Sequence, residues 1–317
     1  MPIFNHILHP TDLSLAAKPA FEEAIALARK FDATLHVLHV APTFGDDPVR
    51  NAFKAAVNED AFYQAVQEEM EQRMEAVLDV HYTEGLSIEK VFMRGNTPSE
   101  VIVEYAAEKN MDVIVMGTNG YKGLRRLVLG SVTANVAREA PCNVITVRNV
   151  TGIIDKQDPF DRILVPVDLE ESSEIQLKEA ALLAKKMNAA LRIVHVIEPF
   201  PFPTWAMSSE MLNDLIPSHV EHVKAKMTEL VEQVVEGVES EIVVAEGKAA
   251  TCIVKHAEEY NADLVVMTPR SSDWMEKVPL GSVAERVMAS SDHPVYLLHV
   301  TDQKAAPQED SQAAATA

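Results

Sequence analysis

The sequence repeats itself, and this internal duplication limits the fold more than any other feature of the chain. Four short blocks recur in the same order, the first two at a spacing of 156 positions and the last two at 151: residues 7–13 and 163–169, 37–40 and 193–196, 112–116 and 263–267, and 130–132 and 281–283. A chain of 317 residues with two such copies is expected to form two domains, because domains of about 150 residues are common.

The stretch that joins the copies and the end of the chain differ in composition from the repeats. Residues 151–160 are largely polar and contain a glycine and a proline, which is typical of a linker. Residues 301–317 are rich in alanine, glutamine and aspartate and show no apolar pattern, so we predict a disordered tail. The predicted domains are residues 1–150 and 161–300.

Within each copy, short apolar runs alternate with stretches of helical spacing. In the first copy the apolar runs predict buried strands at residues 7–9, 34–40, 88–93, 113–116 and 144–147. Helical spacing predicts helices between them, at residues 17–31, 59–80, 99–109 and 131–140. Continuously apolar strands that alternate with helices favour a parallel sheet with right-handed crossovers. The expected fold is α/β, with two tandem doubly wound domains, each a five-stranded parallel sheet flanked by helices.

Two segments have an unusual surface character. Residues 67–73, within the predicted helix at 59–80, carry a run of charges that is typical of a solvated helix face. The matching region of the second copy opens with prolines and aromatic residues at 198–205. That segment could form a flap over an apolar pocket, offer a surface to a partner, or simply cover the edge of the core.

The charge and the cysteine content limit the partners and the compartment. With 28 basic and 48 acidic residues, the formal net charge is −20, which disfavours nucleic acid or an anionic membrane as the main partner. No apolar run is long enough to span a membrane, and the amino-terminus does not resemble a secretory signal. Cys142 and Cys252, one in each half, fit small buried side chains better than a disulfide or a metal site. We therefore expect a cytoplasmic protein.

Glycines concentrate where a phosphate site would be expected. Four of the 11 glycines lie between a predicted strand and a predicted helix, at Gly117, Gly120, Gly123 and Gly130. Glycine permits positive φ angles and lets backbone amides approach a ligand closely. The helix that follows offers unpaired amides and the positive end of a dipole, and Ser131 could cap it. In an open α/β sheet such a crevice lies at the carboxyl ends of the strands, here the first and the fourth.

The spacing of these residues resembles the universal stress protein family, whose nucleotide-binding members carry Gly-x2-Gly-x9-Gly followed by serine or threonine. Here the pattern falls on Gly117, Gly120, Gly130 and Ser131. The resemblance also includes residues 10–12 after the first strand and residues 38–40 at the end of the second, and it covers both halves of the chain up to the tail. It implies an adenine-nucleotide alpha-hydrolase-like fold and a bound adenine nucleotide, ATP or else AMP or ADP, together with Mg²⁺.

The resemblance also implies roles for individual residues. Asp12 would meet the ribose hydroxyls or a phosphate-bound cation, and Val40 would bind adenine through its backbone. The full set of implied binding residues is Pro10, Thr11, Asp12, Val40, Met116, Gly117, Thr118, Gly120, Gly130, Ser131, Val132 and Thr133. Structural roles are the alternative: Asp12 could be a turn or capping residue, Val40 and Met116 core residues, and the glycines tight turns. Three basic residues of the loop would add positive charge near the phosphates or be merely solvated: Lys122, Arg125 and Arg126.

The second copy departs from this pattern. Two residues with β-carbons, Thr268 and Ser271, replace the first two glycines, and Pro269 lacks an amide hydrogen. The retained residues are Asp168, Val196, Gly281 and Ser282. We therefore expect weak or absent ATP binding in the second domain. A smaller anion near Arg270 and Ser282, an apolar ligand, and structural degeneration alone are the alternatives.

Other patterns of catalysis or metal binding find no support in the sequence. His36 and His39 are three positions apart in a predicted strand, so their side chains face opposite sides of the sheet and cannot share a metal. No P-loop motif, nucleophile elbow or His-Glu-x2-His helix occurs. Nothing in the sequence demands an enzyme, and a metal site is left open.

Three functions are compatible with the sequence. The first is a nucleotide-binding stress-response or regulatory protein, in which bound ATP orders residues 117–130 and biases a surface for an unidentified protein partner. The second is a slow ATPase or self-phosphorylating enzyme that uses Ser131 or Thr133. The third is a scaffold that binds no nucleotide, with an apolar-ligand pocket in the second domain.

The resemblance finally implies how the two halves are arranged. Single-domain relatives pair through their last strands, which here are expected near residues 144–147 and 295–300. One chain would then be a pseudo-dimer, and a homodimer of the whole chain is left open.

Overall fold

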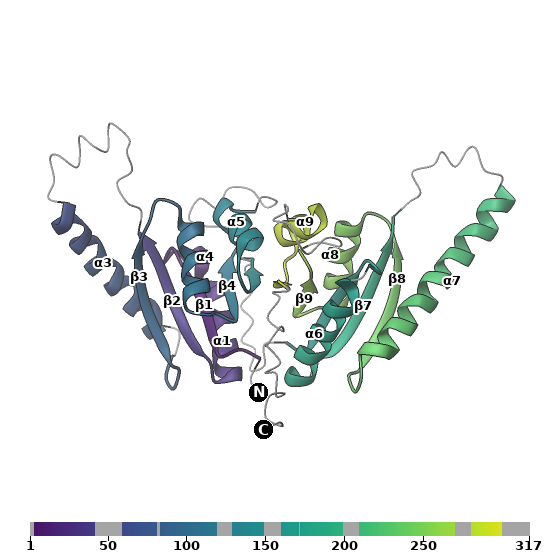
Figure 1. Cartoon of the computed structure of the whole chain (residues 1–317), viewed down its shortest axis with the longest axis horizontal. Coiled ribbons are helices and arrows are strands. Elements are labelled where there is room, and N and C mark those ends of the chain that lie inside the picture. The colour runs from purple at the N-terminus through teal and green to yellow at the C-terminus, as the bar shows by residue number, and fades with distance from the viewer. Residues whose placement is uncertain are drawn as a thin grey trace, which may run out of the picture.

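The computed structural model describes residues 3–41, 59–80, 83–118, 129–148, 160–170, 172–198, 209–269 and 280–299. Within these residues the two halves share one architecture and stand side by side (Figure 1). They meet along a central seam, where residues 144–146 of the first half pair with residues 295–297 of the second. Their strands form a single ten-stranded sheet in the order β3-β2-β1-β4-β5-β10-β9-β6-β7-β8. The second half of this order mirrors the first, so the repeat in the sequence is also a repeat in space.

Each half contributes five parallel strands. Those of the first half are β1 (His6–Pro10), β2 (Thr34–Ala41), β3 (Ile88–Arg94), β4 (Val113–Gly117) and β5 (Asn143–Val147). Those of the second half are β6 (Arg162–Val167), β7 (Ala190–Ile197), β8 (Ser240–Glu246), β9 (Leu264–Met267) and β10 (Val295–Leu297). Neighbouring strands within each half pair in parallel. The prediction of two tandem doubly wound α/β units with five-stranded parallel sheets is confirmed.

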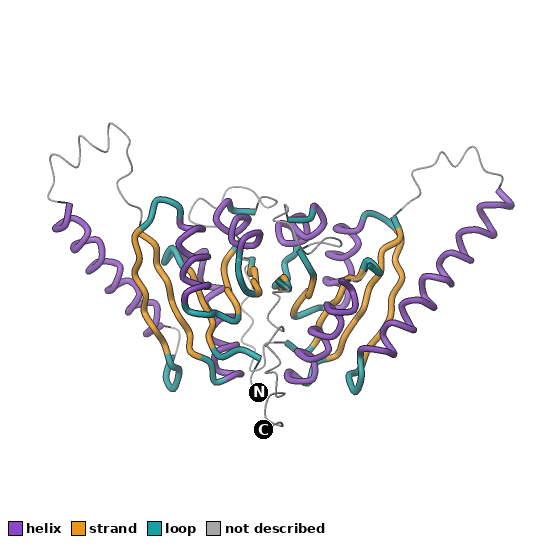
Figure 2. Tube along the Cα trace, viewed as in Figure 1, coloured by secondary structure: helices purple, strands orange, loops and turns teal. Residues whose placement is uncertain are grey.

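Helices connect the strands and cover the sheet (Figure 2). In the first half they are the 3-10 turn η1 (Leu15–Ala17), α1 (Lys18–Phe31), α3 (Glu59–Val80), α4 (Pro98–Glu108) and α5 (Ser131–Glu139). In the second half they are α6 (Ser172–Met187), α7 (Ser209–Val234), α8 (Ala249–Tyr260) and α9 (Ser282–Ser290). Local chemistry sets some of their ends. Pro98 starts α4, where a missing amide hydrogen costs nothing, and α1 ends as Asp32 adopts a left-handed φ of 54°.

The core has two layers, one on each face of the sheet. Successive strand residues point to opposite faces. Phe21 of α1 and Met74 of α3 belong to the same buried layer as Val37 of β2. Ile102 of α4 belongs to the opposite layer, together with Leu38. Each layer includes residues from both halves, so the hydrophobic core continues across the seam.

The predicted charged helix is present as α3, which lies at one outer edge of the molecule, while α7 lies at the other (Figure 1). Most described side chains of α3 are exposed, as expected for a solvated helix face, and three of them are buried: Tyr63, Met74 and Leu78. No helix within the described residues is both long enough and apolar enough to cross a membrane.

The two halves join through β5 and β10, which pair antiparallel with Thr146 opposite Val295 and Val144 opposite Leu297. This is the pairing of last strands that the family resemblance implied. At the centre of the seam, Tyr296 is 4% exposed, and its ring centroid lies 6.3 Å from that of Phe4 in an edge-to-face contact. The Asn143 side chain donates to the Tyr296 hydroxyl at 2.8 Å.

Side chains at the two ends of the seam reach across it. Arg148, which follows β5, donates to the carbonyl of Ser290 at 2.9 Å and to the Asp292 carboxylate at 2.8 Å, at the carboxyl end of α9. His299, 151 positions later in the sequence, follows β10 and donates its amide to the Asn143 side chain at 3.0 Å. Burial lowers the pKa of His299 to about 4, against which a hydrogen bond with the Ala137 backbone acts weakly.

Several predictions fall outside the described residues. They are the linker up to Pro159, the disordered tail at 301–317, the glycine-rich loop at 119–128 and most of the segment at 198–205. The cysteines do lie within them, and neither forms a disulfide. Burial raises the pKa of the Cys142 thiol to about 12, which fits the small buried side chain that was predicted. Cys252 is only partly buried, so the prediction of a buried side chain is wrong there.

Candidate functional site

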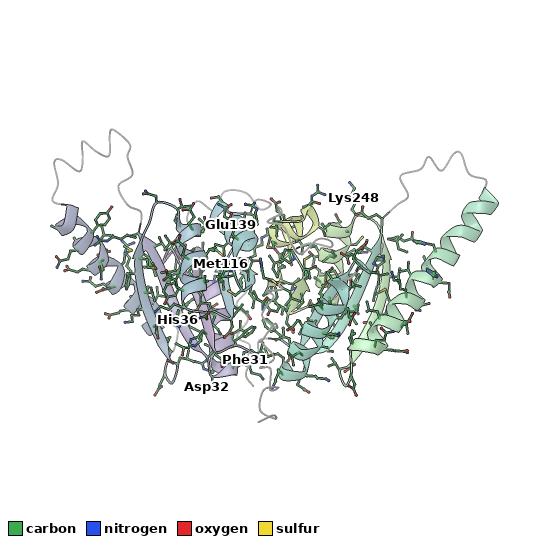
Figure 3. All side chains as sticks on the ribbon, in the orientation of Figure 1. Phe31, Asp32, His36, Met116, Glu139 and Lys248 are labelled. Carbon is green, nitrogen blue, oxygen red and sulfur yellow. The ribbon has the colours of Figure 1, made fainter. Side chains whose placement is uncertain are left out.

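The carboxyl ends of β1 and β4 lie where the strand order changes direction. β1 pairs with β2 on one side and with β4 on the other. The chain continues from β1 to α1 on one face of the sheet and from β4 to α5 on the other face. Figure 3 shows Met116 of β4 toward this edge of the first half, and His36 and Asp32 toward the opposite edge. Open α/β sheets bind ligands in the crevice at such a switch point.

The loop after β1 is held in a fixed conformation beside this edge. Leu13 adopts a left-handed φ of 58°, and the Asp12 carboxylate accepts a hydrogen bond from the Ser14 amide at 3.0 Å. The Thr11 hydroxyl accepts from the Leu13 amide at 3.0 Å, and the Nδ1 of His39 donates to the Thr11 carbonyl at 2.9 Å. Asp12 therefore has the turn role that was considered as an alternative. Its side chain is nevertheless exposed at the edge of the sheet, where it can also meet a ligand.

The first turn of α5 faces the same edge. The Gly130 amide donates to the Thr118 carbonyl at 2.8 Å, and its own carbonyl accepts from Ala134 at 2.9 Å. The amides between these bonds belong to Ser131, Val132 and Thr133. First-turn amides have no partner within their helix, and no group among the described residues accepts from these three. The turn contains no acidic residue, so the amides and the helix dipole favour an anion.

Thr133 has a structural role that the sequence did not reveal. Its hydroxyl donates to the Gly117 carbonyl at 2.8 Å, which ties the start of α5 to the end of β4. The side chain is also buried. Because the hydroxyl is already engaged, Thr133 can serve a ligand through its backbone amide rather than through its side chain.

The described glycines of the pattern do not use the conformational freedom that was expected of them. Gly130 has a φ of −61° and a ψ of 143°, which any residue can adopt. Among the described glycines, positive φ angles occur only at Gly85, Gly237 and Gly247, so Gly117 is not in that region either. The expectation of positive φ is therefore wrong at Gly117 and Gly130. What remains is the second reason for glycine, the close approach of backbone to a ligand.

The structure brings most of the predicted binding residues to one edge of the sheet. Those residues are Pro10, Thr11 and Asp12 at the end of β1, Met116, Gly117 and Thr118 at the end of β4, and Gly130, Ser131, Val132 and Thr133 at the start of α5. Val40 lies half-buried near the end of β2, which pairs with β1. Met116 is 4% exposed and belongs to the core, as its alternative role required. Gly120 and the basic residues Lys122, Arg125 and Arg126 lie outside the described residues.

The second half retains the backbone conformation of this site, both in the turn after β6 and at the start of α9. Leu169 repeats the left-handed conformation with a φ of 66°, and the Asp168 carboxylate accepts from the Glu170 amide at 3.0 Å. Gly281 has a φ of −60° and a ψ of 142°, and its amide donates to the carbonyl of Pro269 at 2.9 Å. The start of α9 therefore has the same backbone as the start of α5.

Carboxylates distinguish the second half from the first, and sequence reasoning missed them. Glu285 lies in the first turn of α9, where α5 has no acidic residue. Glu198, just after β7, accepts from the Ala249 amide at 3.0 Å and so caps the start of α8 across the edge of the sheet. The corresponding helix of the first half begins with Pro98, which has no such amide. Both carboxylates would repel a phosphate, and the position of Glu285 four residues after Gly281 was a readable signal.

The two histidines of β2 face opposite layers, as predicted. His36 is buried with its Nδ1 2.8 Å from the Tyr105 hydroxyl of α4, and burial lowers its pKa. His39 contacts the Thr11 carbonyl instead. No cluster of three or more metal-ligating side chains occurs among the described residues.

The comparison with known families agrees with this architecture and its repeat. The model of the universal stress protein family matches residues 4–148 and again residues 159–312. The chain belongs to the universal stress protein family. The two matches place one family unit in each half of the ten-stranded sheet.

Relatives cover either one half or nearly the whole chain. Universal stress protein MJ0531 of Methanocaldococcus jannaschii is 32% identical over 149 residues, which is 46% of this chain and 83% of that protein. The crystal structure of a universal stress protein from Archaeoglobus fulgidus covers 94% of this chain and 97% of its own, at 22% identity and a TM-score of 0.60. A universal stress protein solved in complex with cAMP is 21% identical, covers 45% of this chain and 98% of its own, and has a TM-score of 0.34.

Proposed function

We propose that the first half of this universal stress protein binds an adenine nucleotide, ATP or else ADP or AMP, at the edge formed by β1, β4 and α5. The observation that carries the proposal is the convergence of the Asp12 loop with the first-turn amides of Ser131, Val132 and Thr133, which have no acceptor among the described residues. Three amides and a helix dipole suit a phosphate chain. Such local groups are needed to attract a phosphate chain, because the net charge of −20 on the whole chain would otherwise repel it.

The remaining parts of the nucleotide have candidate partners at the same edge. Mg²⁺ is usually held by phosphate oxygens, water and one or two carboxylates, and Asp12 is exposed here and would supply a carboxylate. The family pattern gives the ribose to the same residue and adenine to the backbone of Val40. Binding would stabilise one conformation of the edge and so present a surface to a protein partner. The two free cysteines fit a reducing cytoplasm.

Self-phosphorylation or slow hydrolysis is the second candidate function. Of the two hydroxyls considered as acceptors, that of Thr133 is buried and bonded to Gly117, whereas Ser131 is exposed at the start of α5. An intact mass higher by one phosphoryl group after incubation with ATP, and lost in Ser131→Ala, would favour this candidate over simple binding.

Removal of the Asp12 carboxylate should weaken nucleotide binding. Titration calorimetry with ATP and Mg²⁺ is expected to give one site per chain, and Asp12→Ala is expected to lower the affinity at least tenfold, about 1.4 kcal/mol. Asp168→Ala is the matched control, because Asp168 holds the same turn in the second half. Equal affinity in the wild type and Asp12→Ala would refute the assignment of that residue, and no heat with either protein would refute nucleotide binding itself.

Substitution of Gly130 by alanine tests whether this glycine is needed for the close approach of a ligand or for its backbone conformation. Because its φ and ψ suit any residue, Gly130→Ala should cost no more stability than Gly281→Ala, its counterpart with the same backbone angles. Only Gly130→Ala should weaken ATP binding, by about tenfold, because the new methyl group stands where phosphate oxygens approach the amides. Thermal denaturation and calorimetry of the two variants together check both statements. Equal affinities in the two variants would show that the phosphates lie elsewhere.

The second half is proposed to bind nucleotide weakly or not at all. The backbone conformation of the site is the same, but Glu285 in the first turn of α9 and Glu198 at the start of α8 add negative charge at the edge where a nucleotide would bind. The stoichiometry of one nucleotide per chain in the calorimetry above is the corresponding expectation.

A further inference from the structure

A second hollow in the first half lies apart from the first turn of α5. It lies between α3 and the carboxyl ends of β2 and β3, and part of it is open to solvent. The hollow is on the face of the sheet that α3 covers, whereas α5 covers the opposite face. An occupant of this hollow therefore does not need the first-turn amides of α5.

The residues that line the hollow have mostly apolar side chains, and one of them, Arg94, is positively charged and exposed. Tyr63 and Met70 of α3 and Phe92 of β3 supply the apolar walls, and Tyr63 is 4% exposed. Arg94, at the end of β3, is exposed, and its guanidinium lies 4.3 Å from the centroid of the Tyr63 ring. A guanidinium that stacks by its face keeps its N–H groups directed outward in its own plane.

Arg94 forms no ion pair with any carboxylate that the structure describes, whereas Lys90 on the same strand pairs with Glu75 at 3.2 Å. The Arg94 guanidinium stacks on a buried ring and keeps N–H groups that can pair with the carboxylate of a ligand.

A further wall of the hollow is fixed by the loop after β1. His39 lines the hollow, and its Nδ1 donates to the Thr11 carbonyl at 2.9 Å. The ring is therefore held in place before any ligand arrives, which lowers the entropic cost of binding.

The second half shows that the fold does not require this lining. The strand register places Val244 beside His195, as Phe92 lies beside His39. In the same register Ile197 and Glu246 take the places of Ala41 and Arg94. The second half therefore has an aliphatic residue for the aromatic one, a larger residue for the small one, and an anion for the cation. The first half alone has the lining for an anionic aromatic ligand.

We propose that this hollow is a binding site for a small molecule that carries one aromatic ring and one carboxylate. The ring enters between Tyr63, Met70 and Phe92, and the carboxylate pairs with the outward edge of the Arg94 guanidinium. Aromatic rings favour such surroundings, and arginine binds carboxylates in a bidentate manner.

Phenylacetate is a suitable probe, and phenylacetamide is its matched neutral control. The measurement is the shift of the Met70 methyl signal in carbon–proton NMR spectra of the full chain, assigned from the spectrum of Met70→Leu. Phenylacetate should give a saturable shift, and phenylacetamide should bind at least tenfold more weakly. Absence of a saturable shift with phenylacetate, or equal binding of the amide, would overturn the proposal.

Two substitutions test the residues, with a control on the same strand. Arg94→Gln should weaken phenylacetate binding at least tenfold and leave binding of the amide unchanged, whereas Lys90→Gln should change neither. Ala41→Ile, which introduces the residue of the second half, should block both probes by filling the hollow. The proposal fails if Arg94→Gln binds phenylacetate as the wild type does. Amide proton spectra of each variant confirm that the chain is folded.

Discussion

Truncation of Tyr296 to alanine is expected to lower the free energy of unfolding by about 3–5 kcal/mol, the usual cost of removing a buried aromatic side chain. The ring is 4% exposed at the centre of the seam and packs edge-to-face against Phe4 of the other half. Its hydroxyl accepts a hydrogen bond from Asn143 on the neighbouring strand. The substitution therefore opens a cavity between the halves and leaves a polar group without its partner.

Urea denaturation can measure the size of this effect and show whether the two halves unfold together. Both tryptophans, Trp205 and Trp274, lie in the second half of the sequence, so their fluorescence reports on that half, whereas circular dichroism reports on both. In the wild type the two curves should coincide, because the core layers cross the seam. Tyr296→Phe retains the ring and loses only the hydroxyl bond, so it should cost about 1 kcal/mol. A loss below 1 kcal/mol for Tyr296→Ala, or separate transitions in the wild type, would contradict this account of the seam.

Most of the fold could be predicted from the sequence because its signals are local or repeated. The run at residues 113–116 is continuously apolar since β4 is buried on both faces, and observed β4 is Val113–Gly117. The matched blocks fixed the equivalence of the halves without any knowledge of their contacts. Even the opposite orientations of His36 and His39 followed from the two-residue period of a strand.

The details of the candidate site could not be predicted in the same way, because they depend on contacts between distant parts of the chain. The bond from the Thr133 hydroxyl to the Gly117 carbonyl spans 16 positions, and the cap from Glu198 to Ala249 spans 51. Neither leaves a periodic pattern in the sequence. A glycine at a helix start also has two physical explanations, backbone conformation and ligand approach, and only the observed φ of −61° at Gly130 separates them.

Acidification should destabilise the seam through His299, the second large effect that the structure predicts. Burial lowers the pKa of His299 to about 4 from an ordinary value of 6.5, so the folded chain resists the proton that the unfolded chain accepts. The unfolded state binds more protons as the pH falls below 6.5, and stability is lost progressively until the pH passes about 4. A shift of this size corresponds to about 3 kcal/mol, with the full stability present above pH 6.5.

The contribution of His299 can be separated from that of the many carboxylates by a variant that does not titrate. His299→Gln retains a polar side chain that can bond the Ala137 backbone at the end of α5, but it takes up no proton in this range. The free energy of unfolding in urea, measured for both proteins between pH 7.5 and pH 4, should fall more steeply for the wild type by about 3 kcal/mol. Parallel curves for the two proteins would mean that His299 accepts its proton without leaving its buried position. Because the first turn of α5 is the candidate phosphate site, a steeper fall would also place a pH-dependent contact at the far end of the helix that is proposed to bind the nucleotide.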